Sequence, residues 1–111
     1  MAINYGDLSF GTIEPLSSWN PPDHGGIYAI TYRPDYKNKP KRYRVIYFGE
    51  ADKFNKRGIN DTHHKYKCWK EKAGENRLYV SVHQDDNDAS RKNKEKQLIQ
   101  QYTPSCNEEY T

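Results

Sequence analysis

The sequence predicts a small α/β domain in which a three-stranded antiparallel sheet is flanked by helices, in the order ββααβα. Two apolar segments, residues 26–32 and 43–49, are rich in β-branched and aromatic residues, which is typical of strands. Two helical segments then lead to a third alternating segment at residues 77–83, and an amphipathic helix comes last.

The first two strands are predicted to form a β-hairpin. Residues 34–42 between them are rich in Pro, Asp, Asn and Lys, which favours a loop. We expect Tyr28 to lie opposite Tyr47 and Tyr32 opposite Tyr43. Since side chains alternate with a period of two, Tyr28 and Tyr47 would then project from one face.

The remaining elements are predicted to be helical apart from the third strand. Residues 51–57 can form two helical turns, and a second helix is expected from about residue 62 to residue 72. The final helix runs from about residue 89 to residue 102, with Asp88 or Ser90 as its N-cap.

The length of the chain limits it to a single compact domain. With 111 residues, it can bury roughly two-thirds of its unfolded surface in one core. We expect residues 1–24 to wrap around a domain formed by residues 25–111. Only 33% of the residues are hydrophobic, and ten are tyrosines, so the core should have polar rims.

Positive charge is concentrated in the middle of the sequence. Residues 31–72 hold 13 Lys or Arg against 5 acidic residues, whereas the net charge of the whole chain is +3. A basic middle and an acidic remainder indicate a field that attracts a polyanion.

The two cysteines, Cys68 and Cys106, indicate free thiols in a cytoplasmic protein, since there is no leading apolar segment. A zinc site that combined them with His63 and His64 would lack the paired Cys-x-x-Cys spacing of strong zinc motifs. No apolar run approaches the roughly 18 residues of a membrane span, so no membrane contact is expected.

Five elements resemble the GIY-YIG nuclease family when they are taken in order along the chain. These elements are Gly26-Ile27-Tyr28, Tyr47-Phe48-Gly49, Arg57, Glu95 and Asn107. Phe48 replaces the usual middle Ile of the second signature. The resemblance extends from about residue 25 to residue 107, and it implies a small, stand-alone, single-domain member of that family.

The resemblance implies a divalent-metal-dependent endonuclease that hydrolyses DNA phosphodiester bonds by a one-metal mechanism. Glu95 would bind Mg²⁺ or Mn²⁺, because a carboxylate is a suitable ligand for such a hard ion. Considered without the family, the helix favours the alternative that Glu95 is a solvated surface residue that pairs with Arg91 at i,i+4 spacing.

The other site residues that the resemblance implies surround the scissile phosphate. Tyr28 would be the general base, with nearby positive charge favouring its deprotonation. Arg57 offers a planar donor fork for phosphate oxygens. Tyr47 would orient water or phosphate, and Asn107 would contact the catalytic tyrosine or the phosphate. Without a catalytic role, the two tyrosines would be ordinary packing residues of their strands, and Asn107 would be a solvated residue.

The family places a His or Tyr about one helical turn after its arginine, whereas this chain has His63 and His64 further along. Either histidine could donate to the phosphate or relay a proton, so both are candidates.

Basic and aromatic residues near the site are the candidates for nucleic-acid contacts: Lys53, Lys56, Lys65, Lys67 and Trp69. The segment around Trp69 can equally be an amphipathic helix with the ring inward and lysines outward. Target choice would come from the surface around the site, from a homodimer or from a partner protein. The alternative function is a catalytically inactive nucleic-acid-binding module on the same fold.

Overall fold

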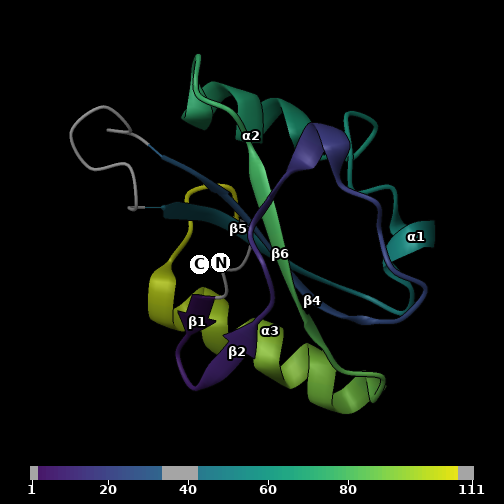
Figure 1. Ribbon diagram of the computed structural model, residues 1–111. Coiled ribbons are helices and arrows are strands. Elements are labelled where there is room, and N and C mark those ends of the chain that lie inside the picture. The colour runs from purple at the N-terminus through teal and green to yellow at the C-terminus, as the bar shows by residue number, and fades with distance from the viewer. Residues whose placement is uncertain (1–2, 34–42, 108–111) are drawn as a thin grey trace.

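The computed structural model describes residues 3–33 and 43–107, and Figure 1 shows their arrangement. The main sheet has four antiparallel strands in the order β3-β6-β4-β5. These strands are β3 (Glu14–Pro15), β4 (Gly26–Tyr32), β5 (Arg44–Ala51) and β6 (Tyr79–Gln84). A separate two-stranded sheet consists of β1 (Ile3–Tyr5) and β2 (Leu8–Phe10).

The predicted mixture of helices with an antiparallel sheet is confirmed, but the predicted number of strands is wrong. Glu14 pairs with Val80, and Pro15 pairs with Tyr79, which adds β3 to the edge of the main sheet. A proline is tolerated there because an edge strand needs no donor on its outer side. From β4 onward the elements follow one another as strand, strand, helix, helix, strand and helix.

The pairing of β4 with β5 differs from the predicted register. Tyr28 lies opposite Gly49, and Ile30 lies opposite Tyr47, with an irregularity between Ile30 and Thr31. Gly49 explains the shift, because a Cβ atom at this position would lie 2.2 Å from Cζ of Tyr28. The ring of Tyr28 therefore lies directly over the backbone of Gly49. The predicted hairpin loop falls outside the described residues.

A register shift of two residues leaves side chains on the same face of a strand. Tyr28 and Tyr47 therefore still project together, and their ring centroids are 5.9 Å apart. The prediction that the two tyrosines share a face is confirmed. The predicted cross-strand pairs, Tyr28 with Tyr47 and Tyr32 with Tyr43, are wrong.

Three α-helices and one short 3₁₀-helix complete the described chain. They are η1 (Leu16–Ser18), α1 (Phe54–Arg57), α2 (Tyr66–Ala73) and α3 (Asp88–Tyr102). Both α1 and α2 begin later than predicted. Before α2, the Asn60 side chain accepts hydrogen bonds from the backbone and hydroxyl of Thr62, and these bonds favour a turn over a helix.

The N-cap of α3 is neither of the two predicted residues. Asn87 is the N-cap, and its side-chain oxygen accepts a 2.8 Å hydrogen bond from the backbone N–H of Ser90. This bond satisfies one of the donors that the first turn of a helix leaves unpaired.

The main sheet separates two hydrophobic clusters. One face carries Tyr28, Tyr47 and Val80 and is covered by Phe54 of α1 and Trp69 of α2. The opposite face is covered by α3 and the β1–β2 sheet; its cluster contains Tyr5, Phe10, Ile27, Ala29, Phe48, Leu98 and Ile99. Figure 1 shows α2 and α3 on opposite sides of the sheet.

The prediction of free thiols is wrong. Cys68 of α2 and Cys106, which follows α3, form a disulfide with their Cα atoms 5.9 Å apart. Their sulfur atoms are therefore not available for the zinc site considered above. Among residues 3–33 and 43–107, every helix is too short or too polar to span a bilayer.

Candidate active site

Two tyrosines and a histidine form the centre of the site. The hydroxyl oxygen of Tyr28 lies 2.8 Å from Nε2 of His63, in a contact that is buried from solvent. Tyr47 packs against both of these residues, with its ring centroid 5.4 Å from that of His63. Residues from β4, from β5 and from the turn before α2 therefore meet on one face of the sheet.

The hydrogen bonds of His63 identify its neutral tautomer. The backbone N–H of Lys65 donates to Nδ1 at 3.0 Å, so Nδ1 carries no proton. Nε2 then carries the proton and donates to the Tyr28 hydroxyl. Burial, followed by the positive charge of Arg57, lowers the pKa of His63 to about 3. The imidazole is therefore neutral near neutral pH.

The pKa of Tyr28 is raised well above the ordinary value of a phenol. Burial is the largest cause, and the neighbouring Tyr47 acts in the same direction. Arg57 lowers the pKa, as the sequence led us to expect, but burial outweighs it. In this arrangement the positive charge of Arg57 does not by itself favour a deprotonated Tyr28.

His64 and Trp69 both pack against the His63 ring, but they differ in exposure. The His64 ring is stacked on that of His63, with a centroid distance of 4.6 Å, and it is exposed to solvent. The ring centroid of Trp69 lies 4.5 Å from that of His63, and Trp69 is fully buried. A buried ring cannot stack on a base, so the expectation that Trp69 contacts nucleic acid is corrected.

The inward position of Trp69 agrees with the amphipathic alternative for α2. The Lys67 side chain on this helix is exposed, while Lys65 immediately before the helix is half-buried. Trp69 and Ala73 are the buried residues of α2. The helix therefore packs its aromatic side against the site and presents charge to solvent.

The basic side chains of α1 and the residues before it surround a shallow cavity. The cavity has a volume of about 390 Å³, and Lys53, Lys56 and Arg57 contribute to its lining. Arg57 is half-buried, and its charge acts on both Tyr28 and His63. Lys53 forms an exposed 3.2 Å ion pair with Asp23. A basic surface thus lies beside the tyrosine cluster.

Glu95 approaches the cluster from the opposite side of the sheet. It belongs to α3, which packs on the face opposite to Tyr28. Its side chain and that of Glu50 line a cavity of about 390 Å³. The negative charge of Glu95 still contributes to the raised pKa of Tyr28, because α3 packs against β5 and the Tyr28 ring lies over β5.

The side chain of Asn107 binds the backbone of β5. Its oxygen accepts a 2.9 Å hydrogen bond from the N–H of Phe48, and its nitrogen donates to the Phe48 carbonyl at 3.0 Å. The expected contact of this amide with the catalytic tyrosine or phosphate is therefore replaced by a contact with the strand. Asn107 is buried, so the alternative of a solvated terminal residue is also wrong.

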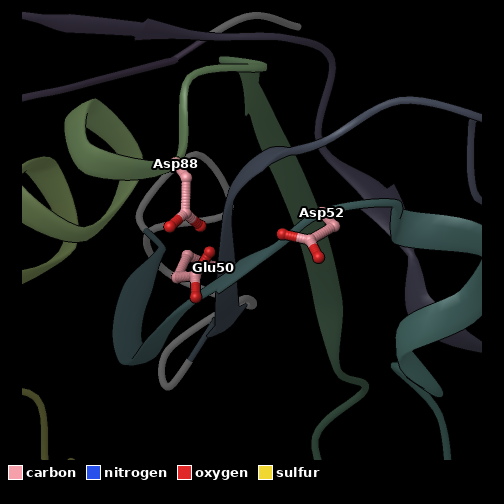
Figure 2. Close-up of side chains that lie close together, drawn as sticks. All are labelled: Glu50, Asp52 and Asp88. Atoms are coloured by element: carbon pink, nitrogen blue, oxygen red, sulfur yellow. The ribbon is translucent and has the colours of Figure 1, made fainter.

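A buried arginine beside the site was not identified from the sequence. Arg91 of α3 forms ion pairs with Glu50 at 3.0 Å, with Asp88 at 2.8 Å and with Asp52. Figure 2 shows these three carboxylates: Glu50 from the end of β5, Asp52 just after that strand, and Asp88 from the start of α3. The i,i+3 spacing of Asp88 and Arg91 was the available signal, whereas the pairing with β5 depends on the fold.

Two groups of carboxylates could hold a divalent cation. One ligand atom from each of Glu50, Asp52 and Asp88 lies within 4.8 Å of the others. The guanidinium of Arg91 already forms ion pairs with all three carboxylates, so a cation would have to displace it. Glu95 instead lies half-buried in a cavity whose lining also includes Glu50 and two lysines, Lys92 and Lys96. Carboxylate oxygens are the ligands that Mg²⁺ and Mn²⁺ prefer, so Glu95 fits the ion.

No family model matches the chain, and comparisons with curated proteins and with solved structures give no significant match.

Proposed function

We propose that this protein is a divalent-metal-dependent endonuclease of the GIY-YIG type, which hydrolyses phosphodiester bonds in DNA. The observation that carries the proposal is the convergence of Tyr28, His63 and Arg57 on one face of the sheet. The Tyr28 hydroxyl lies 2.8 Å from Nε2 of His63, and the charge of Arg57 acts on both side chains. These residues come from separate parts of the sequence. A phenol, an imidazole and a guanidinium are side chains that can transfer protons and stabilise charge in phosphoryl transfer.

In the proposed mechanism, Tyr28 accepts a proton from the attacking water. It can do so only as a phenolate, and the Nε2–H of His63 and the charge of Arg57 both favour this form. Burial opposes it, so the mechanism requires that substrate binding opens the Tyr28 hydroxyl to water. Tyr47 orients the phosphate or the water from the same face.

Arg57 binds non-bridging phosphate oxygens, and this electrostatic stabilisation is a large term in phosphoryl transfer. His63 supports Tyr28 as a neutral donor rather than as a cation, which follows from its bond to the backbone of Lys65. His64 is exposed beside it and can contact the phosphate directly.

Glu95 would hold the Mg²⁺ or Mn²⁺ ion. When bound, such an ion supplies charge neutralisation at the phosphate and assistance to the departing oxygen. Asn107 maintains the position of β5 between Tyr47 and Gly49 through its two hydrogen bonds with Phe48.

The basic surface of α1 and α2 would bind the DNA backbone through Lys53, Lys56, Lys65 and Lys67. Such contacts position a strand without selecting its sequence. A homodimer or a partner protein would supply target choice.

Plasmid nicking in the presence of Mg²⁺ or Mn²⁺ tests this function. We expect the wild-type protein to nick supercoiled DNA, and we expect Glu95→Gln to abolish nicking while it preserves shape and hydrogen-bonding capacity. Glu71→Gln changes an exposed glutamate of α2 and is the matched control. Undiminished cutting by Glu95→Gln would refute the metal assignment.

The alternative function is a DNA-binding module without turnover on the same fold. It is favoured by the burial of Tyr28 and its bond to His63, which together shield the proposed base from solvent. Binding without cleavage, measured across several metals, DNA structures and pH values, would support this alternative.

A further inference from the structure

The disulfide connects two structural supports of the candidate site. Cys68 lies in the first turns of α2, and Cys106 follows α3, with a sequence separation of 38 residues. The chain contains only these two cysteines. One covalent bond therefore links segments that approach the site from different directions.

The support next to Cys106 lies along β5. The backbone N–H of Cys106 donates to the carbonyl of Ile46 at 2.9 Å. The next residue, Asn107, binds both backbone groups of Phe48. Residues 106 and 107 thus contact the backbone on either side of Tyr47.

The support next to Cys68 lies on α2. Trp69 follows Cys68, and its ring centroid is 4.5 Å from that of His63 and 5.5 Å from that of Tyr47. Trp69 and Ala73 are the buried residues of this eight-residue helix. Tyr66 and Cys68 are partly buried against the same core, so the disulfide adds a covalent link to the noncovalent packing of α2.

We propose that the disulfide between Cys68 and Cys106 positions Tyr47 and His63, so that the redox state of these cysteines controls the rate at the site. The effect on rate rests on the proposed nuclease function, whereas the effect on position does not. Cys68 and Cys106 act through Trp69 and through the β5 contacts, and they are positioning residues.

Reduction releases the constraint in a defined chemical step. A dithiol such as dithiothreitol supplies two electrons and two protons, which convert the S–S bond into two thiols. The reductant itself closes to a cyclic disulfide. Cytosolic thiol pools favour the reduced form, whereas oxidising compartments preserve the bond, so activity would follow the redox conditions.

The test measures site geometry and activity separately. Trp19→Phe leaves Trp69 as the only tryptophan, because the chain contains two. We expect dithiothreitol to shift the emission of Trp69 in this variant. We also expect reduction to lower the nicking rate at saturating DNA by about tenfold to a hundredfold, with a smaller change in the DNA concentration for half-maximal rate.

The double variant Cys68→Ala/Cys106→Ala is the matched control, and it should nick slowly and not respond to dithiothreitol. Should this variant fail to fold by far-UV circular dichroism, reoxidation of the reduced wild-type protein replaces it, and recovery of the rate supports the proposal. A reduced protein with native circular dichroism whose rate does not recover on reoxidation overturns it.

Three results overturn the proposal: two free thiols in air-oxidised protein, unchanged Trp69 emission after complete reduction, or equal nicking by oxidised and reduced protein. If neither redox form nicks DNA, the proposed function fails. The emission of Trp69 then decides the positioning role by itself, and a shift supports it.

Discussion

His63 is the residue whose chemistry depends most on its surroundings. A solvent-exposed histidine changes charge near neutral pH, but burial and Arg57 keep this ring neutral down to a pKa of about 3. Nδ1 accepts a hydrogen bond from the backbone N–H of Lys65, so the proton lies on Nε2, which faces Tyr28. The side chain therefore serves the site as a hydrogen-bond donor of defined direction.

This lowered pKa predicts a loss of stability in acid. Below the unfolded pKa of 6.5 the unfolded chain binds a proton that folded His63 does not bind until the pH approaches 3. The free energy of unfolding should therefore fall as the pH decreases from about 6.5 towards 3. Urea denaturation at several pH values measures this fall.

His63→Gln provides the control, because its amide can still donate to Tyr28 but does not titrate. The fall between pH 6.5 and 4.5 should be shallower in this variant than in the wild type. An identical pH dependence of both proteins would show that His63 does not contribute.

Gly49 predicts a second effect at the scale of one residue. In Gly49→Ala the added methyl would lie 2.2 Å from Cζ of Tyr28, so the ring must move away from β5. We expect a destabilisation of about 1–3 kcal/mol, typical of overpacking. We also expect the nicking rate to fall with the loss of the Tyr28–His63 contact. Chemical denaturation and the nicking assay measure both effects.

Gly11→Ala is the matched control for this prediction. A Cβ atom at Gly11 would meet its nearest neighbour, the Val82 carbonyl oxygen, at 3.8 Å, which is an ordinary contact. Equal stability losses in the two variants would contradict the steric explanation.

At the scale of elements, β5 is the strand that the site depends on. It pairs with β4 on one side, and residues 106 and 107 bind its backbone from a distant part of the sequence. Arg91, near the start of α3, binds Glu50 at the end of β5 and Asp52 just after that strand. The position of Tyr47 is therefore determined by contacts with several other segments.

The contact between Asn107 and β5 predicts the cost of its removal. Asn107→Leu leaves the N–H and carbonyl of Phe48 without their present partners in a buried environment. We expect a loss of roughly 2–4 kcal/mol in the free energy of unfolding. Asn93→Leu changes an exposed asparagine of α3 and should have little effect. Thermal and urea denaturation compare the two, and similar losses would exclude the proposed role.

At the scale of the whole molecule, the sheet separates the two kinds of charge that the proposed reaction needs. Arg57 and the basic residues of α1 lie with Tyr28 on one face, and Glu95 approaches from α3 on the other. The two sets meet near the end of β5. Under the proposed function, a phosphate bound there would contact cations on one side and the Glu95 carboxylate on the other.

This arrangement predicts a salt-dependent affinity for DNA. Lys56→Gln and Lys67→Gln should each reduce the slope of log affinity against log salt by about 0.9 if the lysine contacts one phosphate of duplex DNA. Lys72→Gln on the last turn of α2 is the matched control and should leave the slope unchanged. Fluorescence anisotropy at several salt concentrations measures the slopes, and equal slopes in all variants would contradict the basic surface.

Local pattern was sufficient to predict most of the elements. Richness in β-branched and aromatic residues identified the strands that contain Tyr28 and Tyr47, and period-two alternation identified the third strand. These signals depend on residues close together in the sequence. The short N-terminal strand β3 carries too few residues for such a pattern, and it forms because β6 offers it an edge.

By itself, the sequence determined the mixture of helices with an antiparallel sheet and the shared face of the two tyrosines. Only the tertiary structure decided the β4–β5 register, the disulfide, the ion pairs of Arg91 and the face from which Glu95 approaches. The physical reason is that alternation and helical periodicity are properties of neighbouring residues. Burial, pKa shifts and cross-links instead depend on which distant segments pack together, as the Tyr28 ring over Gly49 illustrates.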